Sequence, residues 1–194
     1  MRRPLAGTLA ILIVANELIY WACQFGRGAW TLPKNLPLQL CDVVVFLMGW
    51  ALCHPQHRRV GELAYCWGIA ATSQALLTPD LPPLVPAYIC WKFFLTHASV
   101  VVSAIYLAAG LGWRPTRGAL WRVWGITNLY AVLIAAFNAI IGTNYLYLCA
   151  KPTRPSLLDW LGPWPWYILG MEVLALLFFG LCHLPWVIAD RTRR

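Results

Sequence analysis

The chain has few charged residues, since Asp, Glu, Lys and Arg together make up only 11% of its 194 residues. A soluble domain carries about 25% charged residues, so water does not cover most of this surface. Hydrophobic residues reach 60% and the mean hydropathy is +0.62. The shortage of charge excludes an ordinary soluble domain and indicates a protein that crosses a membrane several times.

Motifs for nucleotides and calcium are also absent. The seven cysteines show no paired metal-ligand spacing, so we expect no metal site and no cofactor. The net charge of +8 is not clustered into a basic patch on a soluble fold, which argues against a nucleic-acid partner. We interpret it as a topology signal with some attraction to anionic lipid head groups.

Six apolar segments are long enough to cross a hydrocarbon core about 30 Å thick, which needs about 20 residues each. They predict an all-α polytopic membrane protein, a bundle of six transmembrane helices that forms one domain over residues 1–194. The third segment contains Glu62, so we expect a buried helix with a polar face. The segments are Leu5–Phe25, Leu36–Cys53, Val60–Leu77, Val85–Leu111, Ala119–Gly142 and Pro165–Ala189.

The first segment begins like a signal peptide, but Asn16 and Glu17 interrupt its apolar run. Tyr20 and Trp21 stand where small residues would precede a cleavage site. We therefore expect this segment to remain as the first helix.

Basic residues are unequally distributed between the two sides of the predicted bundle. Lys and Arg are retained at cytoplasmic helix ends, so both termini are predicted to be cytoplasmic. The inner side then holds ten of the 15 basic residues, namely Arg2, Arg3, Arg58, Arg59, Arg114, Arg117, Arg122, Arg191, Arg193 and Arg194. The outer side holds four, namely Arg27, Lys34, Lys151 and Arg154, and Lys92 lies within the fourth segment.

Polar side chains gather in the outer half of the predicted bundle. An ionisable residue at the bilayer centre costs about 2.5 to 3.5 kcal/mol on insertion scales, so such residues are functional candidates. We expect them to line a polar pocket that opens toward the outer leaflet. The candidates are Asn16, Glu17, Cys41, Asp42, Gln74, Lys92, His97, Asn138, Thr143, Asn144, Tyr145 and Glu172.

Lys92 needs a carboxylate partner, because a buried ammonium ion without one would lose its proton or destabilise the fold. Glu17, Glu172 and Asp42 are the three alternatives. Such a pair is either structural or lines an aqueous cavity that binds a head group or an ion.

The fifth segment carries small and polar residues at spacings of three and four. These are Asn128, Ala131, Ala135, Asn138 and Gly142. Small residues let neighbouring backbones approach, so we expect this face to point into the bundle.

Cys41 and His97 stand at similar predicted depth on different helices, and a thiol beside an imidazole is the minimal activated nucleophile. The thiolate could attack an acyl carbonyl, and a lipid alcohol or water would resolve the thioester. Pro37 is expected in the first helical turn with Cys41 beyond it, so His97 would provide most of the activation. Asn138 or Asn144 could donate to the developing oxyanion.

Several of these motifs resemble the YwaF family of bacterial integral membrane proteins. They are Leu36–Cys41, Gln74–Asp80, Phe93-Phe94 with His97, Gly142–Tyr145 through Lys151-Pro152, and Gly162–Tyr167. This family is similar to transmembrane protein 164, an ether-phospholipid acyltransferase, and distantly to androgen-induced hydrolases of fatty acid esters. Those relatives use a Cys or Thr nucleophile with a His. One departure is Gln39, where family members often have His.

The resemblance implies a multi-pass protein of the bacterial inner membrane that acts on membrane phospholipids or fatty-acyl lipids. Cys41 would be the nucleophile and His97 the base, with Asn138 and residues 142–145 lining the pocket. Two other classes stay open. One is a small transporter or binding subunit in which Glu17, Lys92 and Glu172 form an ion path. The other is a structural protein whose polar residues only hold helices together, and the sequence indicates no oligomeric state.

Overall fold

The computed structural model describes residues 2–81 and 86–191, and all regular structure in these ranges is helical. The all-α prediction is confirmed. The predicted start at Val85 and the basic residues Arg193 and Arg194 lie outside the described residues. The helices are α1 (Arg2–Gly26), α2 (Leu32–Asn35), α3 (Leu40–Cys53), α4 (Arg58–Leu77), α5 (Ala87–Ile105), η1 (Tyr106–Gly110), α6 (Ala119–Ile141), η2 (Tyr145–Tyr147), η3 (Leu157–Leu161) and α7 (Trp166–Arg191).

Four helical stretches are long and apolar enough to cross a membrane, namely α1, α5 with η1, α6 and α7. α3 is apolar but has only 14 residues. At 1.5 Å per residue it is about 21 Å long, less than the hydrocarbon core of about 30 Å. The chain is therefore a membrane protein with several apolar helices, while six membrane crossings stay a prediction.

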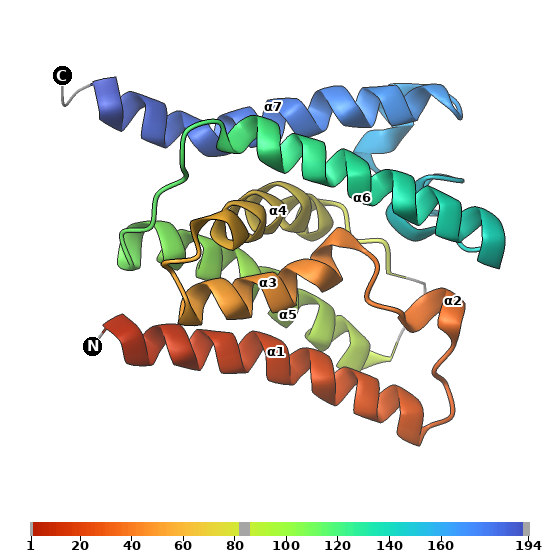
Figure 1. Ribbon diagram of the computed structural model, residues 1–194. Coiled ribbons are helices and arrows are strands. Elements are labelled where there is room, and N and C mark those ends of the chain that lie inside the picture. Colours follow the sequence, from red (N-terminus) through yellow and green to blue (C-terminus); the bar gives the residue numbers. More distant parts are fainter. Residues whose placement is uncertain (1, 82–85, 192–194) are drawn as a thin grey trace.

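The long helices form a bundle around α4 (Figure 1). α3 and α5 pack on one side of α4, with α1 covering both, and α6 and α7 lie on the other side. α1 begins and α7 ends at one end of the bundle, here termed the termini end. The opposite end, where α2 lies, is termed the α2 end.

α4 is the most buried of the long helices, as its polar sequence predicted. Its buried residues include Glu62 and Thr72 as well as Tyr65 and Trp67. Gly68 allows close packing, because a Cβ there would lie 3.1 Å from Met48 and 3.3 Å from Val100. The three side chains nearest this position, Met48, Val100 and Ala104, are apolar and fully buried.

α6 ends where the sequence predicted, at Gly142 in the left-handed conformation (φ 74°). The predicted inward face is only partly right, because Asn138 is buried whereas Ala135 and Gly142 are exposed. The other residues that α6 buries include Val123, Thr127 and Ile134. The physical reason is a buried hydrogen bond, because the Trp67 indole N–H donates to the Thr127 hydroxyl at 2.8 Å and fixes the rotation of α6.

Candidate functional site

The start of α3 differs from the prediction. The helix begins at Leu40, and residues 36–39 precede it as non-helical backbone, with Leu36 and Gln39 extended and Gln39 as the N-cap. Pro37 is therefore outside the helix rather than in its first turn. Cys41 and Asp42 are the second and third residues of α3, so the thiol lies in the first helical turn and not beyond it.

Hydrogen bonds with residues of α6 and η2 hold residues 36–39 in place. The Tyr145 hydroxyl donates to the Leu32 carbonyl at 2.8 Å and accepts from the Leu36 N–H at 3.2 Å. Tyr130 donates to the Leu38 carbonyl at 2.9 Å. The Gln39 side-chain oxygen accepts from the N–H of Leu146, in η2, at 3.0 Å. Non-helical backbone at membrane depth is tolerated only where protein or water satisfies it, and here α6 and η2 do so.

The η2 turn is itself a constrained element. Leu146 and Tyr147 have φ values of 59° and 54°, in the left-handed region that costs about 1–2 kcal/mol for a residue with a side chain. The Tyr147 hydroxyl donates to Asp80 at 3.0 Å, and its carbonyl accepts from Tyr167. Burial, with Asp80 nearby, raises the pKa of Tyr147 above its ordinary value, so the hydroxyl keeps the proton that it donates.

A thiol, two carboxylates and an ammonium ion lie together near the start of α3. Glu17 Oε2 on α1 lies 2.7 Å from Lys92 Nζ on α5, and Glu17 is 2% exposed. Cys41 Sγ lies 4.0 Å from Asp42 Oδ1. Both residues are close enough to Glu17 and Lys92 for electrostatic interaction. These four residues are termed the Cys41 cluster.

The partner of Lys92 is thus settled among the three predicted alternatives, because Glu17 forms the ion pair. The ammonium group also lies 4.4 Å from the centre of the Tyr20 ring, a cation–π contact. Glu172 is elsewhere, on α7, and its Oε2 is buried with no hydrogen-bond partner among the described residues.

His97 is buried on α5, but it is not hydrogen-bonded to Cys41. Its Nδ1 lies 2.7 Å from the Phe93 carbonyl, which can only accept, so Nδ1 carries the proton. Its Nε2 is buried and has no hydrogen-bond partner among the described residues. The imidazole is therefore in the tautomer of a base, with the lone pair of Nε2 unused.

The helix register explains why the thiol and the imidazole do not meet. Met48 on α3 and Val100 on α5 both approach Gly68, so these two residues lie at one level. Cys41 precedes Met48 by seven residues and His97 precedes Val100 by three, and both helices run from the α2 end. At 1.5 Å per residue the backbone of Cys41 lies about 6 Å nearer the α2 end than the backbone of His97, and no hydrogen bond joins the two side chains.

The asparagines predicted as oxyanion donors are already hydrogen-bonded. Asn138 Oδ1 accepts from the Thr143 hydroxyl at 2.7 Å and the Tyr145 N–H at 2.9 Å, and its Nδ2 donates to the Tyr145 carbonyl at 2.8 Å. Asn144 accepts from two backbone N–H groups and donates to the Ala150 carbonyl. In this structure both amides shape the loop that carries Tyr145.

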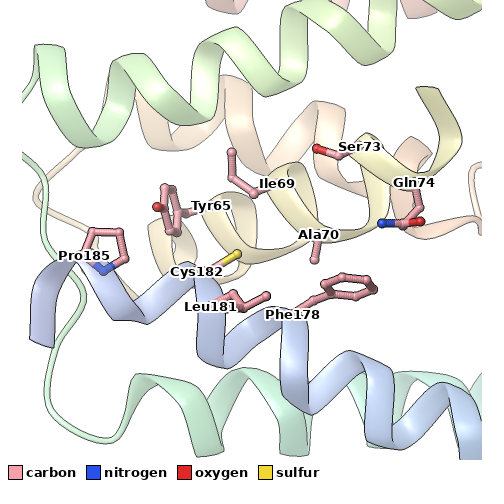
Figure 2. Close-up of a pocket in the computed structure, with 9 residues that line it drawn as sticks. All are labelled: Tyr65, Ile69, Ala70, Ser73, Gln74, Phe178, Leu181, Cys182 and Pro185. Atoms are coloured by element: carbon pink, nitrogen blue, oxygen red, sulfur yellow. The ribbon is translucent and has the colours of Figure 1, made fainter. Parts of the chain in front are cut away.

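Gln74 and Ser73 lie away from the Cys41 cluster, in a groove of about 380 Å³ between α4 and α7 (Figure 2). None of the four cluster residues lines this groove. This groove is termed the α4–α7 groove, and its walls are mostly apolar. Its lining residues are Tyr65, Ile69, Ala70, Ser73, Gln74, Phe178, Leu181, Cys182 and Pro185.

Sequence reasoning missed a second buried ion pair, at the termini end. Glu62 accepts from Arg122 through Nε at 3.1 Å and Nη2 at 3.0 Å, and from the Thr116 N–H at 2.9 Å and hydroxyl at 2.6 Å. These three residues are termed the Glu62 clamp. The available signal was that Glu62 and Arg122 both stand about one turn into their helices at the same end of the bundle.

Comparison with known proteins identifies a family. The sequence model of the TMEM164 family matches residues 1–183. That range includes α1 to α6, most of α7 and all of the Cys41 cluster. No curated protein and no solved structure matches the chain.

Proposed function

The chain belongs to the TMEM164 family, and we propose that it is a membrane-embedded lipid acyltransferase or acyl hydrolase whose nucleophile is the Cys41 thiol. Its substrates would be membrane phospholipids or other fatty-acyl lipids. Support comes from the apolar helices, from the family match and from the thiol within a buried polar cluster. The acyl chemistry is what the resemblance of the sequence implies.

We propose that all six long helices cross a bacterial inner membrane, with both termini in the cytoplasm and the α2 end outside. The common end of α1 and α7 supports an even number of crossings. The excess of arginine predicted for the cytoplasmic side falls at this end, in Arg2, Arg58 and Arg122 among others.

The shortness of α3 is the observation that carries the site. If its last residue lies at the cytoplasmic edge of the hydrocarbon core, its first turn lies about 9 Å below the opposite edge. A helix N-terminus favours negative charge, and Cys41 lies in the first turn of α3. The ester carbonyls of a phospholipid lie at the edge of the hydrocarbon core, so a substrate would have to sink by about 9 Å for its carbonyl to reach Cys41.

The reaction needs a nucleophile, a proton acceptor and a second alcohol. Cys41 Sγ would bond to the acyl carbon, the ester C–O bond would break, and the lipid alcohol would leave with a proton. Attack on the thioester by another lipid alcohol or by water would then release the acyl group and restore the thiol. Asp42 is the nearest proton acceptor at 4.0 Å, whereas His97 would need the helices to shift or a water to bridge.

An apolar layer disfavours a transporter. Ion movement across the protein needs polar groups from one end to the other. The Cys41 cluster and the Glu62 clamp lie toward opposite ends, separated by the fully buried side chains of Val44, Met48 and Val100. This apolar layer disfavours a polar route through the described residues.

The test is site-resolved labelling of the purified protein in lipid nanodiscs with a lipid-tailed chloroacetamide. Cys41 should react at least about tenfold faster than Cys90, a half-buried cysteine near the same end that serves as the internal control. Cys41→Ala should abolish that labelling and the acyl transfer or hydrolysis of a fluorescent phospholipid. Equal, slow labelling of both cysteines would refute Cys41 as a nucleophile.

Two matched variants identify the proton acceptor. Asp42→Asn keeps the shape of its side chain and His97→Gln keeps a polar side chain, and each removes the base. If Asp42 is the acceptor, only the first variant slows Cys41 labelling at neutral pH. A loss confined to His97→Gln would show that substrate binding closes the gap of about 6 Å left by the helix register.

A further inference from the structure

Two cysteines that the proposed acyl chemistry does not use face each other across α4 and α7. Cys66 is fully buried on α4, and Cys182 is 6% exposed on α7. The two thiols are close enough to interact with each other, and both cysteines are free. Figure 2 shows the Cys182 sulfur pointing from α7 toward α4. Neighbouring thiols on packed helices are the arrangement from which a disulfide of about 2.0 Å can form.

The surroundings of this pair select the kind of oxidant that can reach it. Both sulfurs lie in helices of a membrane bundle, where water-soluble oxidants are excluded. Cys182 also lines the α4–α7 groove, whose walls include the aromatic rings of Tyr65 and Phe178. The side-chain amide of Gln74 is a polar group in the wall of the groove. Flat rings and an amide suit a planar, apolar molecule that carries carbonyl oxygens.

We propose that Cys66 and Cys182 form a redox-active pair that a lipid-soluble quinone oxidises in the α4–α7 groove. One sulfur–sulfur bond forms, two S–H bonds break, and two electrons with two protons pass to the quinone, which leaves as the hydroquinone. The reaction is a binding and oxidation function separate from Cys41, so it does not rest on the proposed acyl chemistry.

The bond would change how α7 is held. α7 has 26 residues but only three are buried, namely Tyr167, Phe179 and Cys182. A covalent link at one of these three positions fixes α7 to the central helix and sets the width of the groove beside it. The pair is therefore placed to couple the redox state of the membrane to the packing of α7.

Protein in liposomes under anaerobic conditions, treated with a benzoquinone that carries an alkyl tail, provides the test. Trypsin cuts after Arg59, Lys92, Arg122 and Arg191, which releases fragments 60–92 and 123–191. Fragment 60–92 contains Cys90 besides Cys66, and fragment 123–191 contains Cys149 besides Cys182. The parent protein therefore carries Cys90→Ala and Cys149→Ala. Mass spectrometry then reports the Cys66–Cys182 link without ambiguity.

The parent protein should give the linked fragments and about one hydroquinone per chain, by the two-electron stoichiometry of a disulfide. Cys66→Ala and Cys182→Ala should each remove both signals, whereas Cys53→Ala, at an exposed cysteine, should leave them unchanged. Membrane-impermeant ferricyanide should not form the link. Absence of the link in the parent at saturating quinone, equal linkage by ferricyanide, or unchanged hydroquinone in Cys66→Ala would each overturn the proposal.

Discussion

Two buried ion pairs lie one toward each end of the bundle. Each joins a glutamate to a basic side chain, but the groups around them differ. Glu62 and Glu17 are both 2% exposed and both contact a basic side chain. Both oxygens of Glu62 accept hydrogen bonds, from Arg122 and Thr116. Glu17 Oε2 has its 2.7 Å ion-pair contact with Lys92 but no aligned hydrogen bond.

This difference distinguishes a carboxylate whose oxygens are fully hydrogen-bonded, and which is therefore structural, from a carboxylate that can still accept hydrogen bonds. A buried carboxylate with every lone pair satisfied rigidifies the elements that it joins, here α4, α6 and the segment that contains Thr116. A less satisfied pair keeps its charges available to neighbouring groups. Glu17 and Lys92 lie close to a thiol at the start of a short helix, which is where such charges can influence a reaction.

The largest expected effect comes from breaking the Glu62 clamp. Glu62→Ala leaves the Arg122 guanidinium and the Thr116 N–H without their acceptor, so the free energy of unfolding should fall by about 3–5 kcal/mol. Unfolding titrations in mixed micelles measure the loss. The double variant Glu62→Met with Arg122→Met should recover most of it, because two apolar side chains replace both charges. A loss below about 1 kcal/mol in Glu62→Ala would mean that the clamp is not structural.

The Cys41 cluster is tested by its reactivity, because removing its cation and removing a carboxylate should change the rate of Cys41 labelling in opposite directions. Lys92→Met removes the cation near Cys41 and should slow its labelling about three- to tenfold, equivalent to about 0.7–1.4 kcal/mol. Glu17→Gln removes a negative charge and leaves Lys92 to stabilise the thiolate, so labelling should become faster. Rates of Cys41 modification relative to Cys90 in the same sample give both values. Changes of the same sign would show that packing, rather than charge, controls the thiol.

The sequence predicted the class of the protein and most helix boundaries, because apolar length and Pro or Gly punctuation are local signals. It also placed Glu17, Asp42 and Lys92 at one level, since helix direction and span length fix depth. The prediction of which face of α6 points inward was only partly right, because the rotation of α6 depends on one long-range hydrogen bond between Trp67 and Thr127.

The start of α3 could not be predicted for a similar reason. Residues 36–39 remain non-helical because side chains about 90 to 110 residues away satisfy their backbone, as Tyr130 and Tyr145 do. No local pattern contains that information. The separation of Cys41 from His97 likewise follows from which residues of α3 and α5 meet at Gly68, which depth along a helix does not specify.

Asn138 provides an intermediate test of the α2 end, because the sequence assigned it a chemical role and the structure assigns it a structural one. Asn138→Ala leaves the backbone N–H and carbonyl of Tyr145 and the hydroxyl of Thr143 without a partner, at a site that is 2% exposed. The unfolding free energy should fall by about 1–3 kcal/mol. If lipid turnover fell strongly while stability stayed unchanged, the oxyanion role would be restored.

The smallest expected effect distinguishes the positioning of Cys41 from its chemistry. Gln39→Ala removes the acceptor of the Leu146 N–H, a part-buried hydrogen bond worth about 1 kcal/mol, so stability should change little. Because this bond joins η2 to the residue that caps α3, its loss should loosen the η2 turn, which lies beside the start of α3. Labelling of Cys41 by a bulky lipid probe should then become faster relative to a small water-soluble probe, while Gln39→Glu, which keeps the acceptor, should preserve the wild-type ratio. An unchanged ratio in Gln39→Ala would mean that η2 does not control access, and that the two ends of the bundle differ only in how completely their carboxylates are hydrogen-bonded.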